Sequence, residues 1–187
     1  MLEKISYAKT VYGEEEINAV VECLRESTQM GKRAHKFEIA IAQLFCKKEC
    51  LYVNSGSSAL QIGVEAFDFP KGGEVITPAL TFGTTMSAIV NNNLKPVLID
   101  VEKNTFNIDV DRIERNISKK TKAICVPHLI GNISNLKKIR NLANKYKLFF
   151  IEDSADTLGS KYDGRSTGSF SDASITSFYG SHVISCA

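Results

Sequence analysis

Small hydroxyl-bearing residues follow an apolar run at residues 51–53, where the chain reads NSGSSALQ over residues 54–61. Gly56 permits close backbone approach, and Ser57 and Ser58 offer hydroxyl groups where a helix is expected to begin. The free amides and the positive dipole end of such a helix form a site for an anion such as phosphate. The same residues are typical of an ordinary serine N-cap beside a turn glycine, and the stretch taken alone favours that simpler interpretation.

Three acidic residues follow the apolar run KLFFI, namely Glu152, Asp153 and Asp156. A carboxylate at the end of a buried strand could face a metal ion, a ribose or a protonated ring nitrogen. Loop capping is the ordinary role of a lone aspartate at such a place. The five cysteines lack metal-ligand spacing, and we assign no metal centre.

Two histidines and one aromatic residue also follow apolar runs. His128 comes after KAICVP and is either a catalytic acid or base or, by default, a hydrogen-bonded wall residue. Phe82 belongs to the core or covers a flat ligand. His182, five residues beyond Ser177, is either a base that titrates near neutrality or an incidental polar residue at a strand end. Together these groups supply an anion site, a carboxylate, an aromatic cover and a base, which a phosphorylated heteroaromatic cofactor would use.

The elements that must position these residues alternate along the chain. Several predicted strands, such as KPVLI and KLFFI, are apolar on both faces, which is typical of a parallel sheet covered by helices. An Asp-Gly pair at residues 163–164 predicts a small hairpin. The expected fold is therefore α/β, with three layers and a mostly parallel sheet, and ligands bind beyond the carboxyl ends of such strands. Strands are predicted at residues 51–54, 74–77, 95–101, 122–127, 147–153 and 173–178, and helices at residues 14–27, 36–45, 57–67, 82–92, 109–117 and 135–146.

The composition excludes several classes of function. The chain has 187 residues, 43% of them hydrophobic and 24% charged, and a formal net charge of +2. Such a balance gives no basic footprint for nucleic acid. No window approaches eighteen uninterrupted apolar residues, so no membrane span is expected. The polar N-terminus does not read as a signal peptide, and we expect a cytoplasmic protein with reduced thiols.

The order of motifs resembles the DegT/DnrJ/EryC1/StrS family of vitamin B6-dependent enzymes of sugar-nucleotide metabolism. The resemblance rests on NSGSSAL, GGEVITPALTF, KPVLIDVEKNTFNID, TKAICVPHLIGN, IEDSADTLGS and GRSTGSFSDASITSFY, and it covers residues 12–187. It implies the fold-type I aminotransferase fold and pyridoxal or pyridoxamine 5'-phosphate as cofactor. It also implies a nucleotide-sugar substrate and a homodimer.

The resemblance also implies roles for individual residues. Ser57, Ser58 and Ser177 match positions that bind the cofactor phosphate. Phe82 matches the aromatic residue that stacks on the pyridine ring. Asp153 matches the carboxylate that keeps the pyridine nitrogen protonated, and so keeps the ring an electron sink.

One departure from the family pattern concerns the cofactor lysine. Most members read SFYPTKN where this chain reads SFYGSHV, which places His182 at the position of the lysine. A histidine there resembles the 3-dehydrases of NDP-4-keto-6-deoxyhexoses, in which it would be the catalytic base. Ala155 replaces a cysteine that ligates an iron–sulfur cluster in ascarylose-type members, so the colitose-type mode without a cluster is favoured. The alternatives are an aminotransferase that uses another lysine, such as Lys161, and an inactive remnant.

Family members are roughly twice this length, consistent with a second domain. We therefore expect residues 1–187 to comprise the N-terminal part and the cofactor-binding large domain of a B6-dependent sugar enzyme, without the small C-terminal domain.

Overall fold

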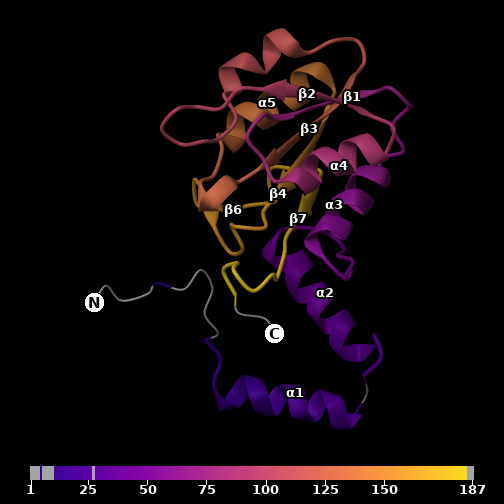
Figure 1. The fold of residues 1–187 in the computed structure, drawn as a ribbon, viewed down its shortest axis with the longest axis vertical. Coiled ribbons are helices and arrows are strands. Elements are labelled where there is room, and N and C mark those ends of the chain that lie inside the picture. Colours follow the sequence, from indigo (N-terminus) through magenta and orange to yellow (C-terminus); the bar gives the residue numbers. More distant parts are fainter. Residues whose placement is uncertain (1–4, 6–10, 27, 185–187) are drawn as a thin grey trace.

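The computed structural model describes residue 5, residues 11–26 and residues 28–184. Its centre is a five-stranded sheet in which every neighbouring pair of strands is parallel. The strands lie in the order β2 (Lys95–Ile99), β1 (Glu74–Pro78), β3 (Thr121–Pro127), β4 (Phe149–Asp153) and β7 (Ala173–Ile175) (Figure 1). The predicted α/β architecture with a parallel sheet is confirmed.

Two hydrophobic clusters, one on each face of the sheet, hold the layers together. Ala123 and Cys125 of β3 belong to one cluster, whereas Ile124 and Val126 belong to the other, because successive side chains of a strand point to opposite faces. The first cluster includes apolar residues of α3 (Gly56–Glu65) and α4 (Gly83–Asn91). The second includes apolar residues of α5 (Leu136–Tyr146), which makes three layers.

Helices α1 (Glu14–Glu26) and α2 (Lys32–Leu44) precede the sheet and extend away from it (Figure 1). The helix predicted at residues 14–27 forms, but it has no buried residue. Its apolar stripe of Ile17, Val20, Val21 and Leu24 is exposed. The amphipathic pattern therefore predicted the helix correctly, but no surface of the described chain covers the apolar stripe.

The predicted hairpin is also confirmed. Strands β5 (Lys161–Tyr162) and β6 (Arg165–Ser166) pair in antiparallel fashion around Asp163 and Gly164. Both turn residues have positive φ angles, 54° and 78°, as a type I′ turn requires.

Three predicted elements were wrong in part. Residues 51–54 do not form a strand, although Leu51 and Val53 have the expected residue types. The helix predicted at residues 109–117 is instead two 3-10 turns, η1 (Val110–Arg112) and η2 (Glu114–Asn116). The last strand ends at Ile175, three residues before the predicted end; directly beyond it the Thr176 hydroxyl donates to the Ser154 carbonyl (3.1 Å).

No helix in the described ranges is both long and apolar enough to span a bilayer.

Candidate active site

The carboxyl ends of three neighbouring strands gather most of the predicted site residues. β3, β4 and β7 are adjacent, and they lead to His128, Asp153 and Ser177 respectively. Helices α3 and α4 begin at the same edge of a parallel sheet, since each follows a chain segment that reaches this edge. Residues far apart in the chain therefore meet at this edge of the sheet.

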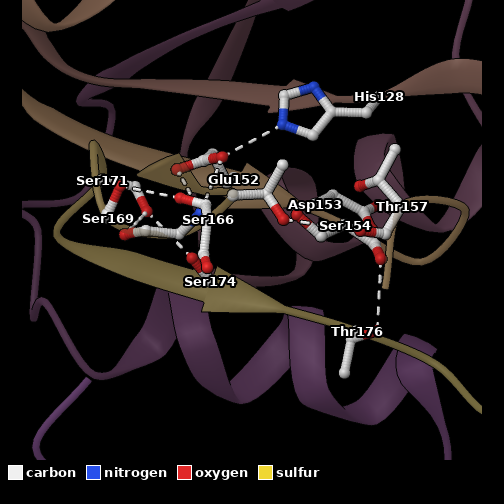
Figure 2. Close-up of polar contacts among 12 residues, drawn as sticks. His128, Glu152, Asp153, Ser154, Thr157, Ser166, Ser169, Ser171, Ser174 and Thr176 are labelled. Atoms are coloured by element: carbon white, nitrogen blue, oxygen red, sulfur yellow. Dashed lines mark hydrogen bonds and ion pairs between the residues drawn. The ribbon is translucent and has the colours of Figure 1, made fainter. Parts of the chain in front are cut away.

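A buried acid–base pair lies behind this edge (Figure 2). His128 Nε2 is 3.1 Å from Glu152 Oε1, and both side chains are fully buried. The N–H of Gly168 donates to both carboxylate oxygens, at 3.0 and 3.1 Å. Burial by itself would raise the pKa of Glu152, but the hydrogen bonds from His128 and Gly168 bring this pKa below its usual value. Glu152 is therefore a structural anion, and His128 is the hydrogen-bonded wall residue of the default interpretation.

Lys47 joins this network, a role that the sequence did not indicate. Its Nζ donates to the carbonyls of Gly168 (2.7 Å) and Ser171 (2.5 Å). Burial lowers the pKa of Lys47, and the negative charge of Glu152 opposes that shift. The lysine thus holds the loop before β7 against the carboxylate of β4.

Asp153 is the last residue of β4 and lies beside Glu152 in the chain. Its Oδ1 accepts the N–H of Ala155 at 3.2 Å. Burial raises the pKa of Asp153, whereas this hydrogen bond and the nearby charges of His128 and His182 lower it. A partly desolvated carboxylate of this kind is suited to a cationic partner that would restore its ionised form.

The N-terminus of α3 meets Ser177 at very close range. A Cβ atom added to Gly56 would lie 2.8 Å from Ser177 Cβ and 3.0 Å from Ser177 Oγ, so only glycine permits this approach. The helix cap is Ser55, whose Oγ accepts the N–H of Ser58 at 3.1 Å. The simpler N-cap interpretation thus holds for Ser55. Ser57 and Ser58 lie in the first turn of the helix, directly after Gly56, the residue that Ser177 approaches.

Phe82 lies at the N-cap of α4, directly beyond β1. Phe82 is 69% exposed to solvent, which is unusual for a large apolar residue. Phe82 is therefore not a core residue, and its free face is available to a flat ligand.

His182 does not lie at a strand end, contrary to the prediction, because β7 ends seven residues earlier and residues 180–184 form a turn and a bend. The ring nevertheless returns to the site. Its Nε2 is 3.6 Å from Asp156 Oδ1, and the ring makes an edge contact with Tyr179. The other nitrogen, Nδ1, is buried and has no hydrogen-bond partner within the described part of the chain.

Asp156 connects His182 to the turn after β3. Its Oδ2 accepts the N–H of Ile130 at 3.2 Å, within η3 (Leu129–Gly131). Ile130 has φ = 52°, a left-handed conformation that is strained for a β-branched residue. Asp156 was identified in the sequence only as one of three acids, and its pairing with His182 depends on the fold of the 176–184 segment.

These features fit a flat, phosphorylated ring. The Gly56–Ser177 approach brings the Ser177 side chain against the N-terminus of α3, and a helix N-terminus of this kind suits a phosphate. Asp153 suits a protonated ring nitrogen, and Phe82 suits a ring face. Within the ranges that the structure describes, no group of three or more His, Cys, Asp or Glu side chains could hold a metal ion.

Comparisons with known proteins agree with this geometry. The model of the DegT/DnrJ/EryC1/StrS aminotransferase family matches residues 11–187. The chain is 38% identical over 183 residues to a dTDP-4-dehydro-2,6-dideoxy-D-glucose 3-dehydratase of Saccharopolyspora spinosa, covering 93% of this chain and 40% of that protein. It is 33% identical to a GDP-perosamine synthase of Caulobacter vibrioides, covering 98% and 50% of the two chains.

A solved structure is similar as well. The Escherichia coli GDP-4-keto-6-deoxy-D-mannose-3-dehydratase with bound hydrated pyridoxal phosphate (PLP) superposes with a TM-score of 0.90 at 27% identity. That match covers 96% of this chain and 48% of the solved chain. The chain thus spans about half the length of the proteins it resembles.

Proposed function

Because the chain belongs to the DegT/DnrJ/EryC1/StrS aminotransferase family, we propose that it provides the cofactor-binding domain and the catalytic base of a 3-dehydrase. The family consists of B6-dependent enzymes that modify sugars, and its cofactor is pyridoxal or pyridoxamine phosphate. The proposed reaction removes the C3 hydroxyl of a nucleoside-diphosphate-linked 4-keto-6-deoxyhexose. Pyridoxamine phosphate is the proposed working form.

The observation that carries this proposal is the nature of the group at position 182. His182 lies among the carboxylates of the site, and the sequence contains no lysine after Lys161. An imidazole accepts and returns a proton near neutral pH, but it forms no stable covalent link to the aldehyde form of the cofactor. The site is therefore better suited to elimination than to a lysine-based amino transfer.

Different residues of the chain would bind different parts of the cofactor. The first turn of α3, with Ser57 and Ser58, and the hydroxyl of Ser177 would bind the phosphate. Asp153 would keep the ring nitrogen protonated, and Phe82 would cover the ring. Bound pyridoxamine phosphate supplies an amine for the C4 ketone and a ring that accepts electrons.

His182 would take up and return the proton at its Nδ1 atom, which has no hydrogen-bond partner among the described residues, while Nε2 faces Asp156. A carboxylate 3.6 Å away stabilises the positive ring that forms when the base accepts a proton. Asp156 is itself fixed by the N–H of Ile130, so the base is held against a rigid turn. Asp156 is in this way a positioning residue for His182.

Amino transfer is the second candidate, because the GDP-perosamine synthase is also a relative. A lysine would then have to reach the site from elsewhere. Lys47 is partly buried, but its Nζ already donates to two carbonyls. Lys161 lies in the β5–β6 hairpin and is exposed. Neither arrangement favours a covalent role.

The test compares products and covalent attachment. The chain is incubated with pyridoxamine phosphate and a 4-keto-6-deoxyhexose nucleotide, and the sugar is analysed by mass spectrometry. Loss of the C3 oxygen supports the proposal, whereas nitrogen at C4 supports amino transfer. In parallel, the protein is reduced with borohydride in the presence of pyridoxal phosphate. Stoichiometric label on a lysine of the wild type, such as Lys47 or Lys161, would contradict the proposal, and His182→Lys should create label on the 162–187 peptide.

We further infer that the protein acts in the cytoplasm as a homodimer. The described cysteines form no disulfide, which suits a reducing compartment. The exposed apolar stripe of α1 suits burial against a further protein surface. Sedimentation at micromolar concentration tests the dimer, and a monomeric species would contradict it.

A further inference from the structure

Two adjoining cavities lie at the amino ends of the strands, at the opposite end of the sheet from Asp153. The larger is about 640 Å³ and is lined by Phe69, Tyr146 and Phe149 among others. The smaller is about 280 Å³ and is lined by the loop before β1 and the start of β2. Lys119 and Lys122 line both cavities, so the two form one groove, which we call the amino-end groove.

The amino-end groove concentrates positive charge. No aspartate or glutamate lines either cavity. Six lysines do: Lys71, Lys95, Lys119, Lys120, Lys122 and Lys147. Across the described residues, none of the six takes part in an ion pair, although the whole chain has a net charge of only +2. Six like charges gathered without partners repel one another, and a bound anion would relieve that repulsion.

The nearest carboxylates are already engaged. Glu74 accepts hydrogen bonds from the hydroxyls of Ser118 (2.5 Å) and Thr121 (3.3 Å). Glu114 accepts from Lys145 (2.5 Å) and from the Tyr146 hydroxyl (2.6 Å). Lys145 thus offsets the charge of Glu114, whereas the neutral partners of Glu74 leave a single negative charge beside the six lysines.

The backbone also helps to place one of these lysines. A Cβ atom on Gly73 would lie 3.0 Å from Lys122 Cγ, so the glycine lets the lysine stem pack closely against the loop. The Lys122 side chain is half-buried as a result. Its position is thus more restricted than that of an ordinary surface lysine.

The other half of the groove is aromatic. Phe67, Phe69 and Phe149 form a three-ring cluster with centroid distances of 4.6 to 5.6 Å. Phe149 is 44% exposed and Tyr146 is 37% exposed on the groove side of the sheet. Partly exposed rings beside clustered lysines match a ligand that has a planar base and several phosphate charges.

We propose that the amino-end groove is a second ligand site, which binds a nucleoside diphosphate group through aromatic contact with the base and lysine contact with the phosphates. The larger cavity, about 640 Å³, falls within the range of small-molecule sites, and the smaller one, about 280 Å³, extends it. The group could belong to a free nucleotide or to a nucleotide sugar. β4 connects this groove to the proposed active site, because Phe149 begins the strand and Asp153 ends it, about 13 Å away.

The test measures GDP binding by titration calorimetry. Lys119→Gln/Lys122→Gln removes two charges that both cavities share, and Lys36→Gln/Lys103→Gln removes two exposed charges elsewhere as the matched control. We expect the groove pair to weaken GDP binding about tenfold or more and the control pair to weaken it less than twofold. Phe149→Leu should weaken the binding of GDP but not of inorganic pyrophosphate. Circular dichroism verifies that each variant is folded.

Further ligands distinguish the possible sources. GDP-mannose is compared with GDP to separate a nucleotide sugar from a free nucleotide, and either result supports the site. Absence of saturable GDP binding, or equal binding by the groove pair and the wild type, would overturn the proposal. Equal affinity for pyrophosphate and GDP would overturn the aromatic contact. Tighter binding of a single-stranded oligonucleotide than of GDP would show that the surface recognises nucleic acid instead.

Discussion

Replacing Glu152 tests whether the buried pair with His128 holds the carboxyl edge of the sheet together. Glu152→Leu would leave His128 Nε2 and the Gly168 N–H without their partner, and both groups are buried. An unpaired buried polar group costs about 1–3 kcal/mol, so the two together should lower the free energy of unfolding by about 4 kcal/mol. Breaking a buried ion pair by removing one partner has a similar cost. Glu152→Gln, which keeps an acceptor oxygen, should cost only about 2 kcal/mol.

The assay is urea unfolding of the 187-residue chain, followed by circular dichroism at neutral pH. Glu49→Gln is the matched control, because Glu49 is exposed and its side chain makes no ion pair or hydrogen bond among the described residues. Its effect should stay within about 0.5 kcal/mol. His128→Leu/Glu152→Leu removes both members of the pair. This double variant should be more stable than Glu152→Leu alone, by about 1–2 kcal/mol.

The pH dependence gives an independent check. The pKa of Glu152 in the folded chain is below its ordinary value of 4.5, so its contribution is present above pH 4.5. That contribution is lost as the pH falls through the lowered pKa. The difference between wild type and Glu152→Gln should therefore shrink in acid. A Glu152→Leu chain as stable as the Glu49→Gln control would refute the structural role of the pair.

Three further predictions follow from the site. Burial raises the pKa of Asp153, so ionised Asp153 destabilises the fold as the pH rises through that pKa. Asp153→Asn should therefore raise the stability of the unliganded chain at neutral pH, and this gain should be absent below pH 3.8. The same substitution should weaken cofactor binding, which is measured by absorbance. An unchanged cofactor affinity would contradict the assignment. Gly56→Ala should cost about 1–3 kcal/mol in urea unfolding, and Ser177→Gly in the same chain should restore part of that loss; no restoration would mean that the close approach is not the cause. Ile130→Gly should stabilise the chain by about 1 kcal/mol in the same assay, because it relieves the positive φ angle, and a loss of stability would show that the side chain has a packing role.

The parallel sheet could be predicted from the sequence because its strands are apolar on both faces. KPVLI and KAICVP became strands, the strand predicted at residues 147–153 begins at Phe149 because Lys147 caps α5, and local backbone preference at Asp163–Gly164 fixed the hairpin turn. The segment at residues 51–54 has similar residue types but no strand partner in the described structure. Pairing is a tertiary property, so strand propensity could not decide that case.

The sequence could predict which residue types would lie at the strand ends, but not which of their side chains would contact one another. Asp153 and Ser177 were expected at strand ends, and the sheet order brings those ends together. Glu152 and Asp153 are neighbours in β4, and successive side chains of a strand point to opposite faces of the sheet. Glu152 is therefore buried against His128, whereas Asp153 lies on the opposite face. The contact of Asp156 with His182 depends on how the chain turns after β7. No local pattern encodes such a turn.

The order of the sheet also makes its two outer edges unequal. At one edge, β2 begins with Lys95 and Pro96, a charge and a residue without an N–H, and both discourage the addition of a further strand. At the other edge, β7 is Ala173–Ile175, with neither a charge nor a proline. β7 is instead limited by its length, since a strand of three residues offers few backbone groups to an added strand. The two edges of the sheet are thus protected by different means, one by residue type and the other by shortness.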